Sequence, residues 1–168
     1  GSFKGHVGGT FDSIAIEGNI QALQIIFNGE AVTNVTGKCN YQDGILKITE
    51  MKCKQADGNI SFDSQVNLIN GSLSGKLKAE GISAKALTSM VNLPNEYLTG
   101  SFSGEVDLNG EISNPGAHLT GKVENGHLKK YPLQEISLDA SYENGIVTIN
   151  RFYGQQNAGK VAARGTWN

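Results

Sequence analysis

The chain has 168 residues, a net charge of −2 and a pI of about 5.9, which argues against a basic surface for nucleic acid. Its 14 Lys and Arg residues are scattered, so we expect no polybasic patch for a membrane surface either. The 22 glycines against 3 prolines favour many tight turns between short strands, and no signal peptide or apolar run of about 20 residues is present.

The first half of the chain is typical of strands joined by turns. We expect strands at 3–7, 10–17, 20–27, 31–41, 45–54, 58–68 and 72–79. The alternation in 10–17 is too irregular to assign its inward face. Asn28-Gly29, Asp43-Gly44 and Asn70-Gly71 predict hairpins, because a type I′ turn needs positive φ at both central residues.

One segment has helical rather than alternating spacing. Ala86, Leu87, Met90 and Val91 would share one helix face, Ser83 is a suitable N-cap, and Pro94 would end the helix. We therefore predict a short helix over 83–93 that caps or bridges an opening in a sheet.

After this helix the strand pattern resumes. We expect strands at 98–108 and 119–123, separated by a turn-rich link at 110–115, because Asn-Pro and Pro-Gly disfavour a central strand. Asn125-Gly126 predicts another hairpin, followed by residues 127–129.

The last stretch, 136–168, contains two strands joined at Asn144-Gly145 and a third that starts at Gly159. A two-residue turn places Tyr142 opposite Val147, so apolar side chains before and after the turn share one face.

This stretch occurs twice. Residues 35–67 align with 136–168 without a gap at an offset of 101, and the tripeptide Gly-Ser-Phe also recurs. Seven pairs are identical: Tyr41/Tyr142, Gly44/Gly145, Ile45/Ile146, Ile48/Ile149, Gln55/Gln156, Gly58/Gly159 and Asn67/Asn168. We predict a repeat unit of about 100 residues. The first copy is 1–99, ending in the short helix, and the second, truncated copy is 100–168.

The sequence offers no catalytic constellation. It has three histidines outside any recognisable motif, and no nucleophile elbow, zinc-protease, P-loop or dinucleotide motif. The turn at Asp43-Gly44 would place Ile48, not Cys53, opposite Cys39, so we expect two small packed residues rather than a disulfide or metal site. We predict no enzyme, no cofactor and no metal.

A family resemblance rests on the run 98–123, LTGSFSGEVDLNGEISNPGAHLTGKV, together with Tyr131-Pro132-Leu133, the strand ending at Trp167, and the helix before Leu98. This layout resembles the TamB and wider AsmA-like family. The resemblance implies a segment of a longer periplasmic protein, anchored in the inner membrane by parts outside this sequence. It also implies an elongated folded antiparallel sheet with a hydrophobic interior, called a β-taco or trough.

The function that the resemblance implies is transport of phospholipid between the inner and outer membranes. On this hypothesis acyl chains contact nine lining residues: Val35, Tyr41, Leu46, Ile48, Leu138, Ala140, Tyr142, Val147 and Ile149. The sequence leaves open a closed sandwich, in which the same residues form a dry core and the repeat is purely structural.

A second hypothesis is an assembly factor that offers a strand edge to outer-membrane β-barrel clients by β-augmentation. The family also implies an Omp85-type partner, bound through other parts of the chain. Because an excised trough exposes edges and apolar surface, we further expect the fragment to self-associate.

Overall fold

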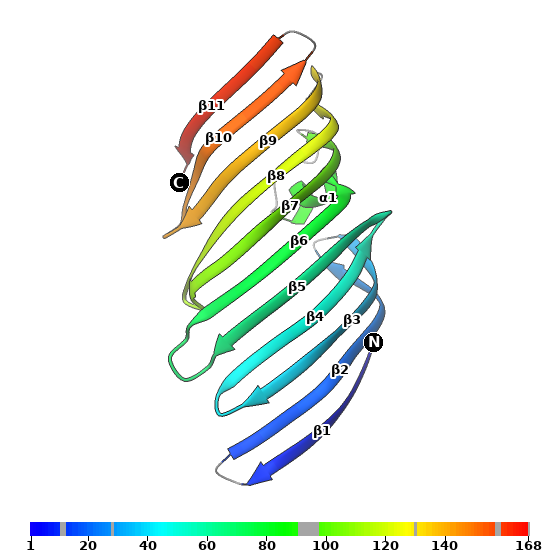
Figure 1. The fold of residues 1–168 in the computed structure, drawn as a ribbon, viewed down its shortest axis with the longest axis vertical. Helices are drawn as coiled ribbons and strands as arrows, with labels where there is room; N and C mark the ends of the chain where they lie inside the picture. Colours follow the sequence, from blue (N-terminus) through cyan, green and yellow to red (C-terminus); the bar gives the residue numbers. More distant parts are fainter. Residues whose placement is uncertain (11–12, 28, 91–97, 130, 157–158, 168) are drawn as a thin grey trace.

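The chain folds into one open antiparallel sheet. A computed structural model describes residues 1–168 except 11–12, 28, 91–97, 130, 157–158 and 168. Each strand pairs with the next one along the chain, so the order is β1 to β11, and the strands succeed one another along the long axis of the molecule (Figure 1). The predicted all-β fold is confirmed, and the described strands form one sheet rather than a two-sheet sandwich.

The strands are β1 (Ser2–Thr10), β2 (Ser13–Phe27), β3 (Glu30–Gln42), β4 (Ile45–Gln55), β5 (Gly58–Asn67), β6 (Leu73–Ser83), β7 (Leu98–Glu111), β8 (Asn114–Leu128), β9 (Tyr131–Glu143), β10 (Ile146–Gln156) and β11 (Gly159–Trp167).

The two faces of the sheet differ in chemistry. Residues paired across neighbouring strands share a face, so the registers define rows that cross the sheet. One row consists of Phe62, Leu77, Val106, Leu119, Ala140 and Ile149. The adjacent row on the other face consists of Ser61, Lys78, Glu105, Thr120, Asp139 and Arg151. The alternation in the sequence therefore produces one apolar face and one polar face.

A short helix covers the middle of the apolar face. This helix, α1 (Ala84–Met90), contacts β3, β6 and β7. The Ser83 hydroxyl accepts a hydrogen bond from the Ala86 amide at 3.4 Å, which confirms the predicted N-cap. Pro94, the predicted stop, lies outside the described residues. The buried apolar cluster comprises Ala79, Ile82, Ala84, Phe102, Val123, Leu133 and Ile136.

Bulges interrupt the pairing on several strands. In β4 the Glu50 amide, at a φ of 54°, donates to the Asp63 carboxylate at 2.7 Å. In β6 the Gly81 amide, at a φ of 67°, donates to the Ser103 hydroxyl at 3.0 Å. In both cases a side chain on the neighbouring strand satisfies the amide that the bulge leaves without a ladder partner. Such bulges bend the strands and increase their twist.

Strands β1–β5 and β7–β11 are related by the 101-residue offset. The bounds of β3 and β9 differ by 101 at both ends, and those of β2 and β8 and of β4 and β10 do the same. The registers also recur, since Cys39 pairs with Ile48 as Ala140 pairs with Ile149. The bulge between β4 and β5 recurs at the same register between β10 and β11. The division of the chain at residues 99 and 100 stays a prediction.

Two turn predictions are wrong. Asn125-Gly126 is not a hairpin turn but lies inside β8, where Asn125 has a φ of 50° and pairing to β9 continues on both sides. Asn adopts the left-handed conformation more readily than most residues, and both bulges and turns use that conformation. An Asn-Gly pair can therefore mark either structure. The turn between β8 and β9 instead follows Leu128.

The expected link at 110–115 is also mostly strand. Gly110 pairs with Pro115 and Glu111 with Asn114, which leaves Ile112 and Ser113 as the turn. Pro115 has no amide hydrogen to donate to a neighbouring strand. It is tolerated because the pairing of β8 with β9 begins only at Ala117 and Tyr142, so no described residue of β9 pairs with Pro115.

The strand expected at 20–27 and the end of the one expected at 10–17 form one continuous strand, β2, which begins at Ser13, while Thr10 belongs to β1. Residues 11–12 and the expected turn residue Asn28 lie outside the described residues. The inward face of β2 is set by the pair Ile16 and Tyr41.

Candidate apolar groove

All nine predicted lining residues lie on the same face of the sheet. Tyr142 pairs with Val147 and with Ala117, and this row continues through Leu108, Gly75 and Ser64 to Ile48. The other six residues share this face as well. Each lies an even number of positions from Tyr142, Val147 or Ile48 along an unbulged part of its strand, or on a strand paired with such a residue. The register therefore brings the two predicted clusters, on β3–β4 and on β9–β10, to one face at two places along the sheet.

The nine residues differ in exposure. Val35 is buried at 4% exposure, whereas Tyr142 is 39% exposed. The other seven, Tyr41, Leu46, Ile48, Leu138, Ala140, Val147 and Ile149, are half-buried. Half-burial is what an open sheet gives to a side chain that packs on its row neighbours but has no second layer above it.

The central part of this face lies outside the nine predicted residues. Between the two predicted clusters lie Ile60, Leu77, Phe102, Leu119 and Val123, which the register also places on the apolar face. Their alternation within 60–77 and 102–123 was available in the sequence and could have identified them.

Near the start of each copy, the ring of a phenylalanine packs on two glycines. The Phe3 ring lies against Gly5 and the cross-strand Gly18, and the Phe102 ring lies against Gly104 and Gly121 in the same way. A Cβ at Gly18 or Gly121 would come within 2.3 Å and 2.5 Å of these rings, so only glycine fits there. The rings fill the face where glycine leaves it without a side chain.

The apolar face is open at both ends. On β1 and β2, Phe3, Val7 and Ile14 are 55%, 66% and 51% exposed, although their pairing places them on this face. At the other end Val161 of β11 is 55% exposed. Helix α1 therefore covers the middle of an apolar strip whose ends face solvent.

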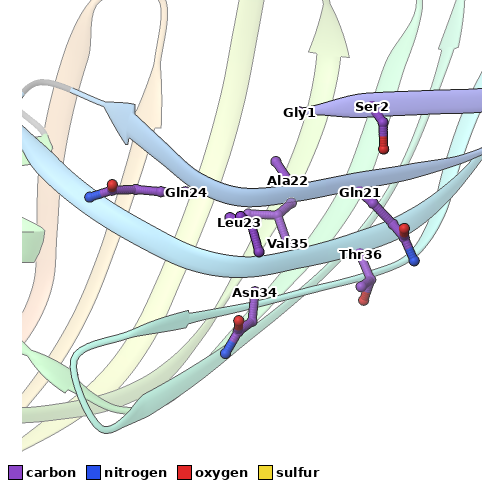
Figure 2. Close-up of a pocket in the computed structure, with 9 residues that line it drawn as sticks. All are labelled: Gly1, Ser2, Gln21, Ala22, Leu23, Gln24, Asn34, Val35 and Thr36. Atoms are coloured by element: carbon purple, nitrogen blue, oxygen red, sulfur yellow. The ribbon is translucent and has the colours of Figure 1, made fainter.

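A hollow of about 630 Å³ lies at the edge of the sheet beside β1 (Figure 2). The pairing of β1 with β2 begins at Ser2 and Gln21, so β2 runs past the start of β1. Figure 2 shows Ala22 pointing towards the start of β1, whereas Asn34 and Thr36 point away from it. The hollow thus joins the apolar face at Ala22 and Val35 to the amide side chains around it.

The polar face carries exposed ion pairs. Lys38 contacts Glu50 at 2.6 Å and Lys76 contacts Glu105 at 2.9 Å. Hydrogen bonding and attraction by these lysines lower the pKa of both glutamates. Such exposed pairs contribute little to stability, so we assign this face the role of solvation.

On the same face Asp139 accepts hydrogen bonds from Asn150 at 2.9 Å and lies 2.9 Å from His118 Nε2. The Asn150 hydrogen bond, followed by that of His118, lowers the pKa of Asp139. This cluster joins β8, β9 and β10, and Asp139 lines a hollow of about 460 Å³ together with charged side chains such as Lys78 and Glu105.

The described part of the chain contains no group of three or more His, Cys, Asp or Glu that could hold a metal ion. Cys39 and Cys53 are free thiols, and Cys39 pairs with Ile48 as predicted, while Cys53 pairs with Ile60. Burial raises the pKa of the Cys53 thiol, which disfavours its reactive thiolate. Among the described residues, no helix is long and apolar enough to cross a membrane.

Comparison with known proteins adds no relative: no family model, no curated protein and no solved structure matches this chain.

Proposed function

We propose that the apolar face is a groove that binds lipid acyl chains, and that this chain is a segment of a carrier for phospholipid between two membranes. The observation that carries the proposal is the apolar strip itself, which crosses the whole sheet and is exposed at both ends. A monomeric soluble domain rarely leaves so much contiguous apolar surface uncovered without a binding role.

The dimensions of the strip suit acyl chains. Eleven strands at a spacing of about 4.8 Å give a strip of about 48 Å. The hydrocarbon core of a bilayer is about 30 Å thick, so the acyl chains of one leaflet extend over about 15 Å. The strip is therefore about three times as long as one extended acyl layer. A chain of 16 carbons needs about 12 kcal/mol of apolar contact to leave a bilayer, at about 0.8 kcal/mol per methylene. A continuous strip can supply that contact at every point along a path.

The repeat favours a path rather than a single binding site. Because β2–β4 and β8–β10 have the same bounds at the 101-residue offset, adding further units would lengthen the apolar strip without changing its cross-section. The resemblance to the TamB and AsmA-like family supports the same proposal, with the periplasm as its place of action and the inner and outer membranes as its ends.

Photocrosslinking tests the proposal. A photoreactive amino acid would replace Ile149, on the apolar face, or Thr148, which pairs with Ser141 on the polar face. The purified chain is illuminated with vesicles of phosphatidylethanolamine and phosphatidylglycerol, and the adducts are identified by mass spectrometry. We expect phospholipid adducts at Ile149 and not at Thr148.

A second pair controls for local disruption at a half-buried site. Val7 and His6 are neighbours on β1, on the apolar and polar faces respectively, and both are exposed. Lipid adducts at equal yield on both faces, or at neither, would contradict a groove. A polypeptide captured in place of lipid would show that the face binds protein.

A further inference from the structure

Two neighbouring turns in the middle of the chain present exposed aliphatic side chains. Leu68 and Ile69, between β5 and β6, are 55% and 79% exposed, and Ile112, between β7 and β8, is 54% exposed. We call these three residues the rim patch. Successive turns of the meander alternate between two rims of the sheet, and both of these turns lie on the same rim, from which the β5–β6 turn projects (Figure 1). The rim patch therefore exposes apolar surface at a place where polar turn residues are the rule.

The chain around the β5–β6 turn carries no charge. No Asp, Glu, Lys or Arg occurs from residue 64 to residue 75. The β3–β4, β7–β8 and β9–β10 turns on the same rim have Asp43, Glu111 and Glu143 in or beside them. Removing a charge from water is costly, whereas an uncharged turn meets no such cost. Of these four turns, the β5–β6 turn is thus the one suited to an apolar environment.

The amides of this turn are satisfied within the protein. The Asn67 side-chain oxygen accepts hydrogen bonds from the amides of Ile69 and Asn70, at 2.9 Å and 3.2 Å. The Asn70 side-chain oxygen accepts one from the Ser72 amide at 2.9 Å. The remaining amides of 67–72 donate to backbone carbonyls: those of Asn67, Leu68 and Gly71. An amide without a partner is costly away from water, and these amides all keep a partner when water leaves.

The neighbouring turns hold the β5–β6 turn in place. The Leu68 amide donates to the Gly44 carbonyl of the β3–β4 turn at 2.7 Å, and the Ile112 amide donates to the Gly71 carbonyl at 2.9 Å. Ile69 lies over the β3–β4 turn, since a Cβ at Gly44 would come within 2.5 Å of its side chain. The three turns are therefore connected, and the rim patch needs little further ordering when it binds.

The rim patch is continuous with the apolar face. Val66 pairs with Leu73 at the rim end of β5 and β6. This pair lies four positions along each strand from Phe62 and Leu77, which belong to the apolar face, and so it shares that face. Leu68 follows two residues after Val66. An acyl chain at the rim patch would thus reach the apolar face without passing a charged side chain.

The size of the patch favours a bilayer over a protein as its partner. A stable protein interface uses about 20–30 residues on each side, whereas the rim patch has only its three aliphatic side chains. A bilayer surface requires no matching shape. Aliphatic side chains on a projecting turn can enter the boundary between the headgroups and the acyl chains.

We propose that the rim patch is a membrane-contact site, at which Leu68, Ile69 and Ile112 insert into the boundary between the headgroups and acyl chains of a bilayer. The contact is apolar rather than electrostatic, because the charged residues in the flanking turns, Asp43 and Glu111, are acidic. This proposal goes beyond the binding of acyl chains by the groove, and it holds whether or not the groove binds lipid.

Vesicle flotation tests the contact. The 168-residue chain is mixed with vesicles of phosphatidylcholine, which has no net charge, and a lipid titration gives the partition coefficient. Ile69→Asn should lower this coefficient about tenfold, the factor expected when one aliphatic side chain loses its burial. Ile112→Asn should lower it by a smaller factor, because Ile112 is less exposed. Both side chains are exposed, so the variants should fold, which circular dichroism checks.

Ile26→Asn is the matched control. Ile26 is 67% exposed and lies next to the last residue of β2, on the opposite rim of the sheet. Its substitution removes the same side chain at similar exposure, and the partition coefficient should not change. High salt should not weaken binding either, because salt screens charges and not apolar contacts.

The proposal is overturned if the chain does not float with the vesicles, or if Ile26→Asn weakens binding as much as Ile69→Asn. Binding that high salt abolishes would assign the contact to the lysines of the polar face and would equally refute it. A photoreactive residue in place of Ile69 should capture lipid. If it captures a second copy of the chain instead, the rim patch binds protein and the proposal fails.

Discussion

Strands β5 and β11 occupy the same place in the two copies but differ in environment. Ile60 of β5 is half-buried and packs against the central cluster, whereas Val161 of β11 is 55% exposed. Gln55 is buried at 6% exposure, and the identical Gln156 is exposed. The difference comes from β6 and α1, which follow β5 and have no described counterpart after β11. Burial in this sheet is therefore conferred by the next strand and helix rather than by the local sequence.

The polar faces of the two copies differ in another way. Lys38 and Glu50 form an ion pair in the first copy, and their counterparts are Asp139 and Arg151, with the charges exchanged. Arg151 attracts Asp139 and contributes to lowering its pKa. The sequence positions are preserved while the sign of each charge is not, as expected where opposite charge matters more than which strand carries it. The register differs by one residue, because Lys38 pairs with Thr49 whereas Asp139 pairs with Arg151.

The largest effect should come from the two phenylalanines that pack on glycine pairs. Phe102→Ala should destabilise the chain by about 3–5 kcal/mol, because Phe102 is 3% exposed and its loss leaves a cavity over Gly104 and Gly121. Phe3→Ala should cost about 1 kcal/mol, since Phe3 is already 55% exposed. Urea denaturation measures both free energies of unfolding. Equal losses would show that the two ends of the strip are as well packed as its middle.

The next effect separates β5 from β11. Gly58→Val should destabilise the chain by about 1–3 kcal/mol, because a side chain there collides with the backbone at Gly81 and Ile82. Gly159→Val, at the matching site, should leave the free energy of unfolding unchanged within about 0.5 kcal/mol. Thermal unfolding of the two variants provides the comparison. A large loss for Gly159→Val would mean that the β11 edge is already covered in the isolated chain.

A smaller effect concerns the bulge in β4. Asp63→Ala should cost about 1 kcal/mol, because the Glu50 amide loses its acceptor. Arg164→Ala, at the counterpart of Asp63, should have an effect within about 0.5 kcal/mol. Hydrogen exchange of the Glu50 amide checks the assignment directly, since it should accelerate in Asp63→Ala. An unchanged exchange rate would show that Asp63 does not hold this amide.

The smallest effect is a pH dependence at Asp139. Its pKa is lowered in the folded chain, so it contributes stability above its unfolded pKa of about 3.9. That contribution is lost as pH falls through the folded pKa. Between about pH 5 and pH 2, Asp139→Asn should therefore lose less stability than the unsubstituted chain. Lys38→Gln, at the counterpart position, should also flatten the acid limb, but through another carboxylate, because it removes the lysine that lowers the pKa of Glu50. Parallel acid limbs for Asp139→Asn and the unsubstituted chain would contradict the assignment.

The sequence by itself determined the elements whose causes are local. The period-two alternation defines which residues share a face. The nine predicted lining residues follow from it together with the turns at Asp43-Gly44 and Asn144-Gly145. The same local reasoning located the Ser83 cap and the pairing of Cys39 with Ile48, both of which the structure confirms. The 101-residue offset was visible before any strand was placed, because turn glycines and inward apolar residues recur at fixed spacing.

Only the tertiary structure decided how ambiguous local signals were used. Asn144-Gly145 is a turn and Asn125-Gly126 is part of a strand, although both asparagines have a φ near 50°. The left-handed conformation serves a turn or a bulge equally well, and β8 continues because β7 and β9 pair with it beyond Asn125. Burial was likewise undetermined, since Ile60 and Val161 have similar side chains and the same local pattern. Their exposure differs because β6 and α1 lie beside only one of them, and packing between distant segments is not encoded in a period of two.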